Sequence, residues 1–349
     1  MMRVIGVMSG SSLDGIDVAC CRFERTGERW CGSVEAARTV PYPPELRQQL
    51  ERASGASGLE LARLHTVVGQ AIGAACKDLL AEHPADLIAS HGHTVFHQPA
   101  AGFTTQVGCG ATIAAITGTT VACDFRSKDV ALGGQGAPLV PFGERHLFPE
   151  HRTFLNLGGI ANLSHHLPDR VVGYDVGPCN QALNGLAAEA GLRFDPAGSM
   201  ARRGSVVPAL LAALDALPFY RQPPPRSLGR EWYEEHMRPL LDDRSIPIAD
   251  RQRTAVEHIA GAIGSELARA GAGSCLVTGG GAHNALLIER IQAASPVPIL
   301  RPDALMIDFK EAYIFAFLGL LRHRGEVNTL ASVTGACRDS VGGALYLPN

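Results

Sequence analysis

Residues 3–23, RVIGVMSGSSLDGIDVACCRF, hold two apolar runs separated by a turn of small residues. The runs Arg3 to Met8 and Ile16 to Phe23 both have the composition of strands. Between them, Ser9 to Gly15 ends in Asp14-Gly15, a pair that is common in tight turns. The stretch therefore predicts a β-hairpin whose turn is rich enough in Gly and Ser for backbone N–H groups to approach a phosphate.

Two further glycine turns stand at the ends of apolar runs: Asn156-Leu-Gly-Gly at 156–159 and Thr278-Gly-Gly-Gly at 278–281. Each turn alone is compatible with simple punctuation of the chain. Three such turns at strand ends favour a nucleotide-binding cleft, because phosphate is bound by backbone N–H donors. The chain has no G-x-x-x-x-G-K-[ST] and no helix-opening G-x-G-x-x-G, so neither a P-loop nor a dinucleotide-binding fold is favoured.

The rest of the chain alternates strand and helix patterns, which is typical of an α/β protein. LIASHGH at 87–93 and CLVTGGG at 275–281 are each a buried strand predicted to break into a small-residue turn. A strand, glycine turn and strand also occur twice, so we expect two similar halves. Strands are expected at 86–90, 104–108, 120–125, 153–157, 160–165, 171–176 and 274–278, and helices at 44–53, 59–82, 111–117, 180–190, 251–270, 284–294 and 310–324.

A length of 349 residues predicts about two domains. We expect a first lobe of residues 1–126 plus 329–349 and a second lobe of residues 127–328, with an insertion around 195–245 and the active site in the cleft between the lobes. The glycine-rich stretch Arg126 to Pro141 is expected to cross between the lobes or line the cleft.

Charge and cysteine content indicate which partners and which cellular compartment to expect. Lys plus Arg total 31 and Asp plus Glu total 34, so nothing favours nucleic acid or a membrane surface as a partner. The nine Cys include no C-x-x-C pair, which indicates reduced thiols. No segment reaches the roughly 18 apolar residues of a membrane helix, and the N-terminal residues lack a signal-peptide pattern. We therefore expect a cytoplasmic protein with a small-molecule partner.

Eight segments, in chain order over nearly the whole length, resemble successive blocks of the anhydro-N-acetylmuramic acid kinases, which are sugar kinases of the actin, hexokinase and Hsp70 superfamily. They are IGVMSGSSLDGIDVA (5–19), SHGHTVFHQP (90–99), TTQVG (104–108), DFRSKDVALGGQGAPLVP (124–141), FLNLGGIANLS (154–164), YDVGPCNQALN (174–184), TGGGAHN (278–284) and KEAYIFAFL (310–318). The chain departs from the family pattern at three positions, with Ser11 for Thr, His93 for Gln and Cys179 for Gly. None of the three removes a group that the chemistry requires.

The resemblance implies a two-lobed actin-like ATPase fold of the ribonuclease H-like type, internally duplicated, with central mixed sheets flanked by helices. It also implies a reaction of peptidoglycan recycling. ATP phosphorylates O6 of 1,6-anhydro-N-acetylmuramic acid while water opens the anhydro bridge at C1, giving N-acetylmuramic acid 6-phosphate. The oligomeric state is left open, with a homodimer as one option.

ATP and Mg²⁺ are the cofactors that the resemblance implies, with no dedicated metal site in the protein. The residues expected to bind the nucleotide are Gly10, Ser11, Ser12, Leu13, Asp14, Gly15, Ile16, Asp17, Asn156, Gly158, Gly159, Gly279, Gly280 and Gly281. Asp14 is expected to orient magnesium-bound waters, since Mg²⁺ keeps several waters in protein sites. The alternative is that Asp14 is only the aspartate of an Asp-Gly hairpin turn.

Asp175 is the expected catalytic base. It ends the buried run VVGYD and precedes a glycine turn and a helix, which places a carboxylate at a cleft mouth. The alternative is an N-cap for the helix after Pro178. The match to the family motif favours the base.

Four further residues are expected to contact the sugar. The guanidinium of Arg126 matches the lactyl carboxylate in geometry, although a surface ion pair is an alternative. The resemblance places Glu311 at the sugar, whereas its helix pattern alone would fit a cap or a surface carboxylate. His93 and His97 are expected to hydrogen-bond the sugar.

The pattern H-x-H-x-x-x-H formed by His91, His93 and His97 also fits a zinc site. No Asp or Glu lies among the three, and alternation would aim them to one side only if the strand continued past Gly92. Sugar binding is therefore preferred.

Three other functions are open on the sequence. One is a kinase of the same superfamily that acts on a simple hexose or an acetate-like acid. A second is a non-catalytic ATP-dependent sensor of cell-wall fragments, which loss of Asp175 would have favoured. The third is a hydrolytic metalloenzyme built on the three histidines, which would need tightly bound metal.

Overall fold

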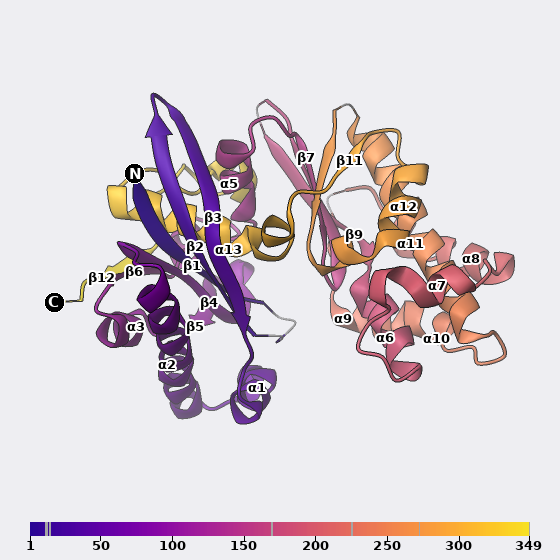
Figure 1. Ribbon diagram of the computed structural model, residues 1–349, viewed down its shortest axis with the longest axis horizontal. Coiled ribbons are helices and arrows are strands. Elements are labelled where there is room, and N and C mark those ends of the chain that lie inside the picture. The colour runs from indigo at the N-terminus through magenta and orange to yellow at the C-terminus, as the bar shows by residue number, and fades with distance from the viewer. Residues whose placement is uncertain (11–12, 14, 169, 225, 272, 349) are drawn as a thin grey trace. The chain divides into compact units, whose positions relative to one another are not determined.

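A computed structural model of the chain describes residues 1–10, 13, 15–168, 170–224, 226–271 and 273–348. The chain forms two compact units (Figure 1). The first consists of Met1–Pro149 and Phe309–Asn349, and the second of Glu150–Asp308.

The chain passes between the units after Pro149 and after Asp308, and not at the expected boundaries of 126 and 328. Residues 127–149 stay with the first unit because α5 (Val140–Leu147) packs on β3 (Arg29–Val40). The stretch Arg126 to Pro141 therefore does not cross between the units.

The later boundary has a similar reason. The helix α13 (Ala304–Arg324) is kinked at Phe309, and from there onward it packs in the first unit. The ammonium of Lys310 forms a buried ion pair with Glu144 of α5, 2.9 Å apart. Burying that charge without a partner would be costly, so the pair ties the C-terminal segment to α5.

The first unit is built on a mixed sheet with the strand order β12-β6-β4-β1-β2-β3, in which β5 also pairs with β4. Its strands are β1 (Met2–Ser9), β2 (Ile16–Thr26), β3, β4 (Leu87–Gln98), β5 (Phe103–Val107), β6 (Thr120–Cys123) and β12 (Ala344–Tyr346). β1 and β2 pair antiparallel from Met2↔Phe23 to Met8↔Asp17, which confirms the predicted hairpin. β3 was not predicted, because it is an edge strand in which no side chain is fully buried and no apolar periodicity is seen.

Helices cover both faces of this sheet. They are α1 (Pro44–Glu51), η1 (Ala53–Gly55), α2 (Gly58–Glu82), η2 (Pro99–Ala101), α3 (Gly110–Thr117), α4 (Ser127–Ala131), α5, α13 and α14 (Ala331–Thr334). α2 begins at a capping box, in which the Ser57 side chain and the Glu60 side chain each accept a backbone N–H of the other residue. On one face of β1, Ile5 belongs to the same buried cluster as Ile72 of α2.

Gly6 points to the opposite face, where α13 lies. A Cβ at Gly6 would collide with the carbonyl oxygen of Ala312. Glycine at this position therefore lets the helix backbone approach the sheet closely.

β4 continues to Gln98, although the sequence predicted an end at Ser90. Pairing with β5 from His93↔Val107 to Gln98↔Phe103 keeps the chain extended. Gly92 has φ 72°, and a Cβ there would lie 2.7 Å from the carbonyl oxygen of Val107. The glycine thus permits a bend within a continuous strand, and it does not end that strand.

The second unit repeats the sheet plan with the order β11-β10-β7-β8-β9. Its strands are β7 (Thr153–Leu157), β8 (Ile160–His166), β9 (Val171–Pro178), β10 (Cys275–Thr278) and β11 (Ile299–Leu300). β7, β8 and β9 pair antiparallel, while β10 runs parallel to β7 and β11. In the first unit β1, β2 and β3 are likewise antiparallel, with β4 and β6 joined in parallel. This shared order confirms the duplicated, ribonuclease H-like α/β fold with mixed sheets flanked by helices.

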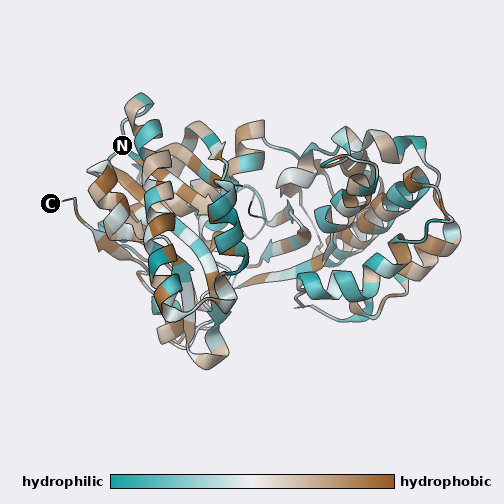
Figure 2. Ribbon diagram, turned by 90° about the horizontal axis from the view of Figure 1, so that it is seen from below, coloured by the Kyte–Doolittle hydropathy of each residue, from teal (hydrophilic) through white to brown (hydrophobic). Residues whose placement is uncertain are grey.

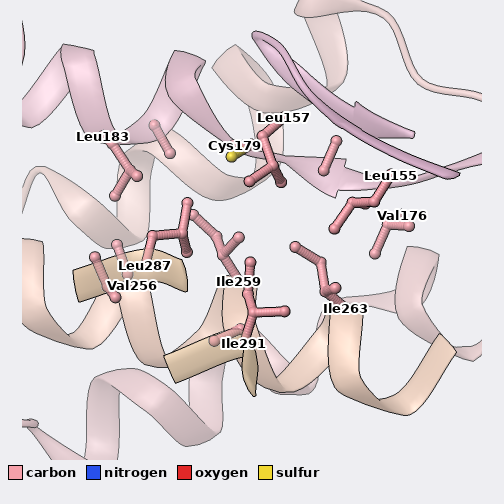
Figure 3. Close-up of a cluster of buried hydrophobic side chains, with 14 of the residues drawn as sticks. Leu155, Leu157, Val176, Cys179, Leu183, Val256, Ile259, Ile263, Leu287 and Ile291 are labelled. Carbon is pink, nitrogen blue, oxygen red and sulfur yellow. The ribbon is translucent and has the colours of Figure 1, made fainter. Parts of the chain in front are cut away.

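The helices of the second unit are α6 (Asn180–Glu189), η3 (Pro196–Gly198), α7 (Ser199–Arg203), α8 (Pro208–Asp215), η4 (Pro218–Arg221), α9 (Arg230–Trp232), η5 (Tyr233–Met237), α10 (Arg238–Leu241), α11 (Ile248–Ala270), η6 (Gly280–His283) and α12 (Ala285–Ala294). Its core joins sheet and helices: Leu155 and Val176 of the sheet point toward Ile259 and Ile263 of α11 (Figure 3). The expected insertion at 195–245 is largely helical, and its Leu214 belongs to this core.

Hydrophobic and hydrophilic residues alternate along the helices of both units, as expected for helices with one buried face (Figure 2). In the part of the chain that the structure describes, no helix combines the length and the apolar character needed to cross a membrane.

Candidate active site

Two of the three glycine turns lie side by side in the second unit. β10 and β7 pair up to Thr278↔Asn156, so the turns that follow them start at the same level of the sheet. A Cβ at Gly279 would collide with the Asn156 side chain and lie 3.0 Å from the Leu157 backbone nitrogen. Parallel pairing thus places Thr278 beside Asn156, although 122 positions separate them in the sequence.

The start of α6 braces the turn between β7 and β8. The N–H groups of Cys179 and Gln181 donate to Gly159 O at 2.8 and 3.1 Å, and Asn180 N–H donates to Gly158 O at 3.1 Å. The Asn180 side chain also donates to Leu157 O at 2.9 Å. With its carbonyls bound in this way, the turn has the N–H groups of Gly158 and Gly159 without a partner among the described residues.

Cys179, where the family pattern has Gly, lies at the N-cap of α6. Its backbone has φ −125° and ψ −96°, a combination outside the broad β and right-handed α regions, and its thiol is fully buried. Its N–H still donates to Gly159 O, so the contact between α6 and the turn is made with a cysteine at this position.

Two buried polar atoms near these turns lack a hydrogen-bond partner among the described residues: the Thr278 hydroxyl and the amide oxygen of Gln181. Buried polar groups normally have a partner, so these atoms indicate a place where a polar ligand or water binds. The Thr278 hydroxyl and the N–H groups of Gly158 and Gly159 can donate to phosphate oxygens, whereas the Gln181 amide oxygen can only accept a hydrogen bond.

Substituting Gly279 by Ala should destabilise the second unit. Gly279 has φ 84°, and its Cβ would also collide with the turn after β7. Gly271 is a matched control, because it has φ 85° but open space around its Cβ position. We expect a loss of about 1–3 kcal/mol in the free energy of unfolding for Gly279→Ala and a smaller loss for Gly271→Ala, measured by urea titration. Equal losses would mean that backbone strain alone matters and that the turns are not closely packed.

The third glycine turn, between β1 and β2, is described only in part. Ser11, Ser12 and Asp14 lie outside the described residues. Leu13, with φ 56°, donates its N–H to Gly10 O at 3.2 Å, and a Cβ at Gly15 would lie 2.6 Å from Val40 O.

Two residues predicted to contact the nucleotide, Ile16 and Asp17, follow this turn and make contacts within the first unit. The Ile16 side chain is 2% exposed and belongs to the core of the first unit. The Asp17 carboxylate accepts a hydrogen bond from the Thr39 hydroxyl at 2.6 Å, which joins β2 to β3.

Asp175 lies inside β9, which continues through Val176 and Gly177 to Pro178, so it does not end the strand as predicted. Its carboxylate is half-buried. One oxygen, Oδ2, accepts hydrogen bonds from Leu228 N at 2.8 Å and from the Ser227 hydroxyl at 3.1 Å. Oδ1 has no hydrogen-bond partner among the described residues. Burial raises the pKa of Asp175, and the two hydrogen bonds oppose that rise only in part.

The N-cap alternative for Asp175 is wrong. The residue at the N-cap of α6 is Cys179, and no side chain caps that helix. Asp175 instead contacts Ser227 and Leu228, which follow it by 52 and 53 residues. Sequence reasoning missed these two donors, because a serine and a backbone N–H in an irregular stretch carry no recognisable signal.

In the first unit, Arg126 begins the glycine-rich stretch and is half-buried. Its Nε donates to His91 Nε2 at 2.9 Å and its Nη1 donates to Gly136 O at 2.7 Å. Neither partner is a carboxylate, so these two hydrogen bonds are not the surface ion pair that was the alternative for Arg126. Burial lowers the pKa of Arg126 to about 10, and the charge of Glu311 opposes that shift.

Glu311 lies inside α13 and is half-buried, which rules out the exposed carboxylate that its helix pattern suggested. Burial raises its pKa, although the charges of Lys310 and Arg126 act in the opposite direction. No hydrogen bond joins the Glu311 carboxyl to another described residue. Arg126 and Glu311 are therefore an electrostatically coupled pair, and each retains hydrogen-bonding capacity.

The three histidines of β4 have separate partners. His91 accepts from Arg126, His93 is bonded through Nδ1 to the Ser9 hydroxyl at 2.9 Å, and His97 is bonded to Thr104 at 3.2 Å. Ser9 is in turn bonded to the Tyr42 hydroxyl. Burial lowers the pKa of all three, and the charge of Arg126 also lowers that of His91 and His97.

The strand does continue past Gly92, which was the condition set for a shared histidine site. Even so, His91 and His93 are buried and His97 is exposed. Within the described residues, no group of three or more His, Cys, Asp or Glu side chains is arranged to hold a metal ion.

Comparison with known proteins gives a consistent result. A family model described as anhydro-N-acetylmuramic acid kinase matches residues 2–348. An anhydro-N-acetylmuramic acid kinase of Xanthomonas campestris pv. campestris (strain 8004) is 39% identical over 366 residues, covering 98% of this chain and 96% of the relative. Another, from Shewanella amazonensis, is 37% identical over 370 residues, covering 98% of each.

Solved structures are more distant in sequence. The activator of 2-hydroxyisocaproyl-CoA dehydratase from Clostridium difficile, with bound ADPNP, aligns with a TM-score of 0.48 at 14% identity, covering 93% of this chain and 96% of its own. A ROK family glucokinase from Streptomyces griseus, in complex with glucose and AMPPNP, aligns with a TM-score of 0.44 at 13% identity, covering 91% and 99%.

Proposed function

Because the chain belongs to the anhydro-N-acetylmuramic acid kinase family, we propose that it uses ATP to phosphorylate O6 of 1,6-anhydro-N-acetylmuramic acid while water opens the anhydro bridge. The product is N-acetylmuramic acid 6-phosphate, and the reaction serves peptidoglycan recycling in the cytoplasm. Membership of the family supports the kinase activity, and the opening of the anhydro ring is the additional part of this proposal.

The observation that carries the ring-opening step is the environment of Asp175. Its Oδ2 is bonded to Ser227 and Leu228, and its Oδ1 has no partner among the described residues. A carboxylate fixed in this way presents one oxygen to a water molecule. The raised pKa makes it a stronger base than an ordinary aspartate.

The proposed reaction couples opening of the anhydro bridge to phosphoryl transfer. Water forms a bond to C1 and gives its proton to Asp175, and the bond between C1 and the bridging O6 breaks with its electron pair on O6. The charge that develops on O6 makes that oxygen the nucleophile toward the γ-phosphorus of ATP. ADP leaves as the new O6–P bond forms, so no second base is needed to activate O6.

The sugar contacts in this proposal come from the first unit. Arg126 has Nη2 without a hydrogen-bond partner among the described residues, and we assign it to the lactyl carboxylate of the sugar. Glu311 and His93 are assigned to sugar hydroxyl or amide groups. His97 is bonded to Thr104 and lies within the field of Arg126, which is compatible with the same role.

ATP is assigned to the glycine turns. The N–H groups of Gly158 and Gly159, with the turn at Gly279 to Gly281, fit the phosphates. Mg²⁺ bound with the nucleotide would supply charge neutralisation at the transferred phosphoryl group. Its predicted water-mediated contact, Asp14, lies outside the described residues.

The test is the mass of the product. The pure protein is incubated with ATP, Mg²⁺ and 1,6-anhydro-N-acetylmuramic acid, and the sugar is analysed by mass spectrometry. We expect a product that has gained both a phosphoryl group and a water, and none when EDTA is present. A product with phosphate but an intact anhydro bridge would contradict the ring-opening step, and turnover of a simple hexose alone would support the rival kinase.

A further inference from the structure

A buried arginine, Arg226, is hydrogen-bonded to the backbone of Asp175 and has no part in the proposed chemistry. Arg226 is 8% exposed and stacks over the ring of Phe219, with its guanidinium carbon 4.6 Å from the ring centre. A buried guanidinium requires several acceptors and a counter-charge to offset its lost hydration. The acceptors that it uses show what it holds in place.

The guanidinium of Arg226 joins both ends of its own segment to the strand that carries Asp175. Nη1 donates to Gln222 O at 2.6 Å and to Phe219 O at 3.4 Å. Nε donates to Asp175 O at 3.2 Å, and Asp175 N–H donates to Arg226 O at 2.9 Å. One side chain thus fixes the path of the segment and its alignment beside β9.

The counter-charge is Glu266 of α11. Arg226 Nη2 donates to Glu266 Oε1 at 2.7 Å, and both side chains are 3% exposed. The other oxygen, Oε2, accepts from the Tyr174 hydroxyl at 3.0 Å and forms an ion pair with Arg269 at 3.2 Å. Tyr174 is the neighbour of Asp175 in β9, so Glu266 braces the strand and the segment together.

We propose that Arg226, held by Glu266, is a positioning residue for Asp175. It holds the segment at the place where Ser227 and Leu228 bind Asp175 Oδ2, and so it leaves Oδ1 oriented toward the water. This inference rests on the proposed role of Asp175 as the base. It adds that the buried ion pair sets the geometry of that base across three elements that are far apart in the sequence.

The chain offers a matched control on α11. Arg251 is also a buried arginine, with a side chain 5% exposed and paired with Glu189 at 3.0 Å. It too binds backbone carbonyls of an adjacent segment, Leu241 O at 2.7 Å and Ile246 O at 3.1 Å. None of these groups contacts Asp175 or its donors, so Arg251→Lys tests the structural cost of such a change alone.

The experiment compares kcat, the KM of both substrates and the melting temperature for Arg226→Lys and Arg251→Lys. Lysine keeps the charge but cannot make the forked contacts. We expect both variants to melt at a lower temperature, and only Arg226→Lys to lose kcat, by about ten- to a hundredfold. The KM of ATP should stay within about twofold of wild type in both, since neither residue contacts the glycine turns.

Two further variants keep the inference testable if Arg226→Lys does not fold. Glu266→Gln retains the shape of the partner but removes its charge, and Ser227→Ala removes one donor to Asp175 at an exposed position. Each should lower kcat several-fold. Combined with Arg226→Lys, Ser227→Ala should cost less than it does alone, because the donor is already displaced.

Unchanged kcat in folded Arg226→Lys or Glu266→Gln would overturn the positioning role. So would an equal kcat loss in Arg251→Lys. A separate assay of Asp175→Asn distinguishes failure of the positioning role from failure of the base assignment. If Asp175→Asn is inactive while Arg226→Lys turns over normally, only the positioning role of Arg226 is contradicted. If Asp175→Asn retains kcat, the assignment of Asp175 as the base fails, and the positioning role fails with it.

Discussion

Asp175→Asn should lower kcat by about 10²–10⁴ while the affinity for ATP changes little. Water is a poor nucleophile toward C1 unless a base accepts its proton as the bridge breaks. Asparagine keeps the shape of aspartate and an oxygen that can accept from Leu228 N–H, but it cannot accept a proton. Because O6 becomes nucleophilic only when the bridge opens, phosphoryl transfer should be lost together with ring opening.

The variant should stay folded, since Asp175 does not cap α6. The measurements are kcat, the Kd of ATP and the melting temperature on the same preparation, with Asp242→Asn as the control, because Asp242 is a surface aspartate paired with Arg238. A variant that retains a third or more of the wild-type kcat would show that another group removes the proton. Slow phosphorylation without ring opening would separate the two halves of the reaction and contradict the coupled mechanism.

Arg126→Ala should raise KM for 1,6-anhydro-N-acetylmuramic acid by roughly ten- to a hundredfold, and KM for ATP much less. A lost charge-assisted hydrogen bond costs about 1.5–3 kcal/mol, which gives this range. The guanidinium is already held by His91 and Gly136, so it is oriented before any ligand arrives. Arg126→Lys should recover only part of the loss, because an ammonium cannot make a bidentate contact.

The control for Arg126 is the substrate itself. An analogue without the lactyl carboxylate should bind wild type and Arg126→Ala with similar KM, since the lost contact is then absent from both. The melting temperature must also be compared, because the alanine variant frees His91 and the carbonyl of Gly136. Equal increases in KM for sugar and for ATP would move Arg126 from the sugar contact to a structural role.

Local pattern was sufficient for most of the strands and helices. The run from Thr153 to Leu157 forms β7 with the predicted bounds, because apolar residues there are bordered on one side by a glycine turn. The strand at 86–90 was extended by pairing that its own residues do not reveal, since the polar stretch to Gln98 is held by β5. The edge strand β3 was missed for the same reason: its stability comes from β2 and not from its own composition.

The sequence by itself determined the family, the α/β class, the duplicated halves and the identity of Asp175, Arg126 and Glu311 as candidates. These follow from short motifs and from local periodicity, both of which are written along the chain. Only the tertiary structure decided what surrounds those residues: the donors that bind one oxygen of Asp175, the coupling of Arg126 with Glu311, and the ion pair of Arg226 with Glu266. Hydrogen bonds and buried charges act over a few ångströms in space, whereas these partners are separated by 40 to 185 positions in the chain, and no local pattern specifies such pairs.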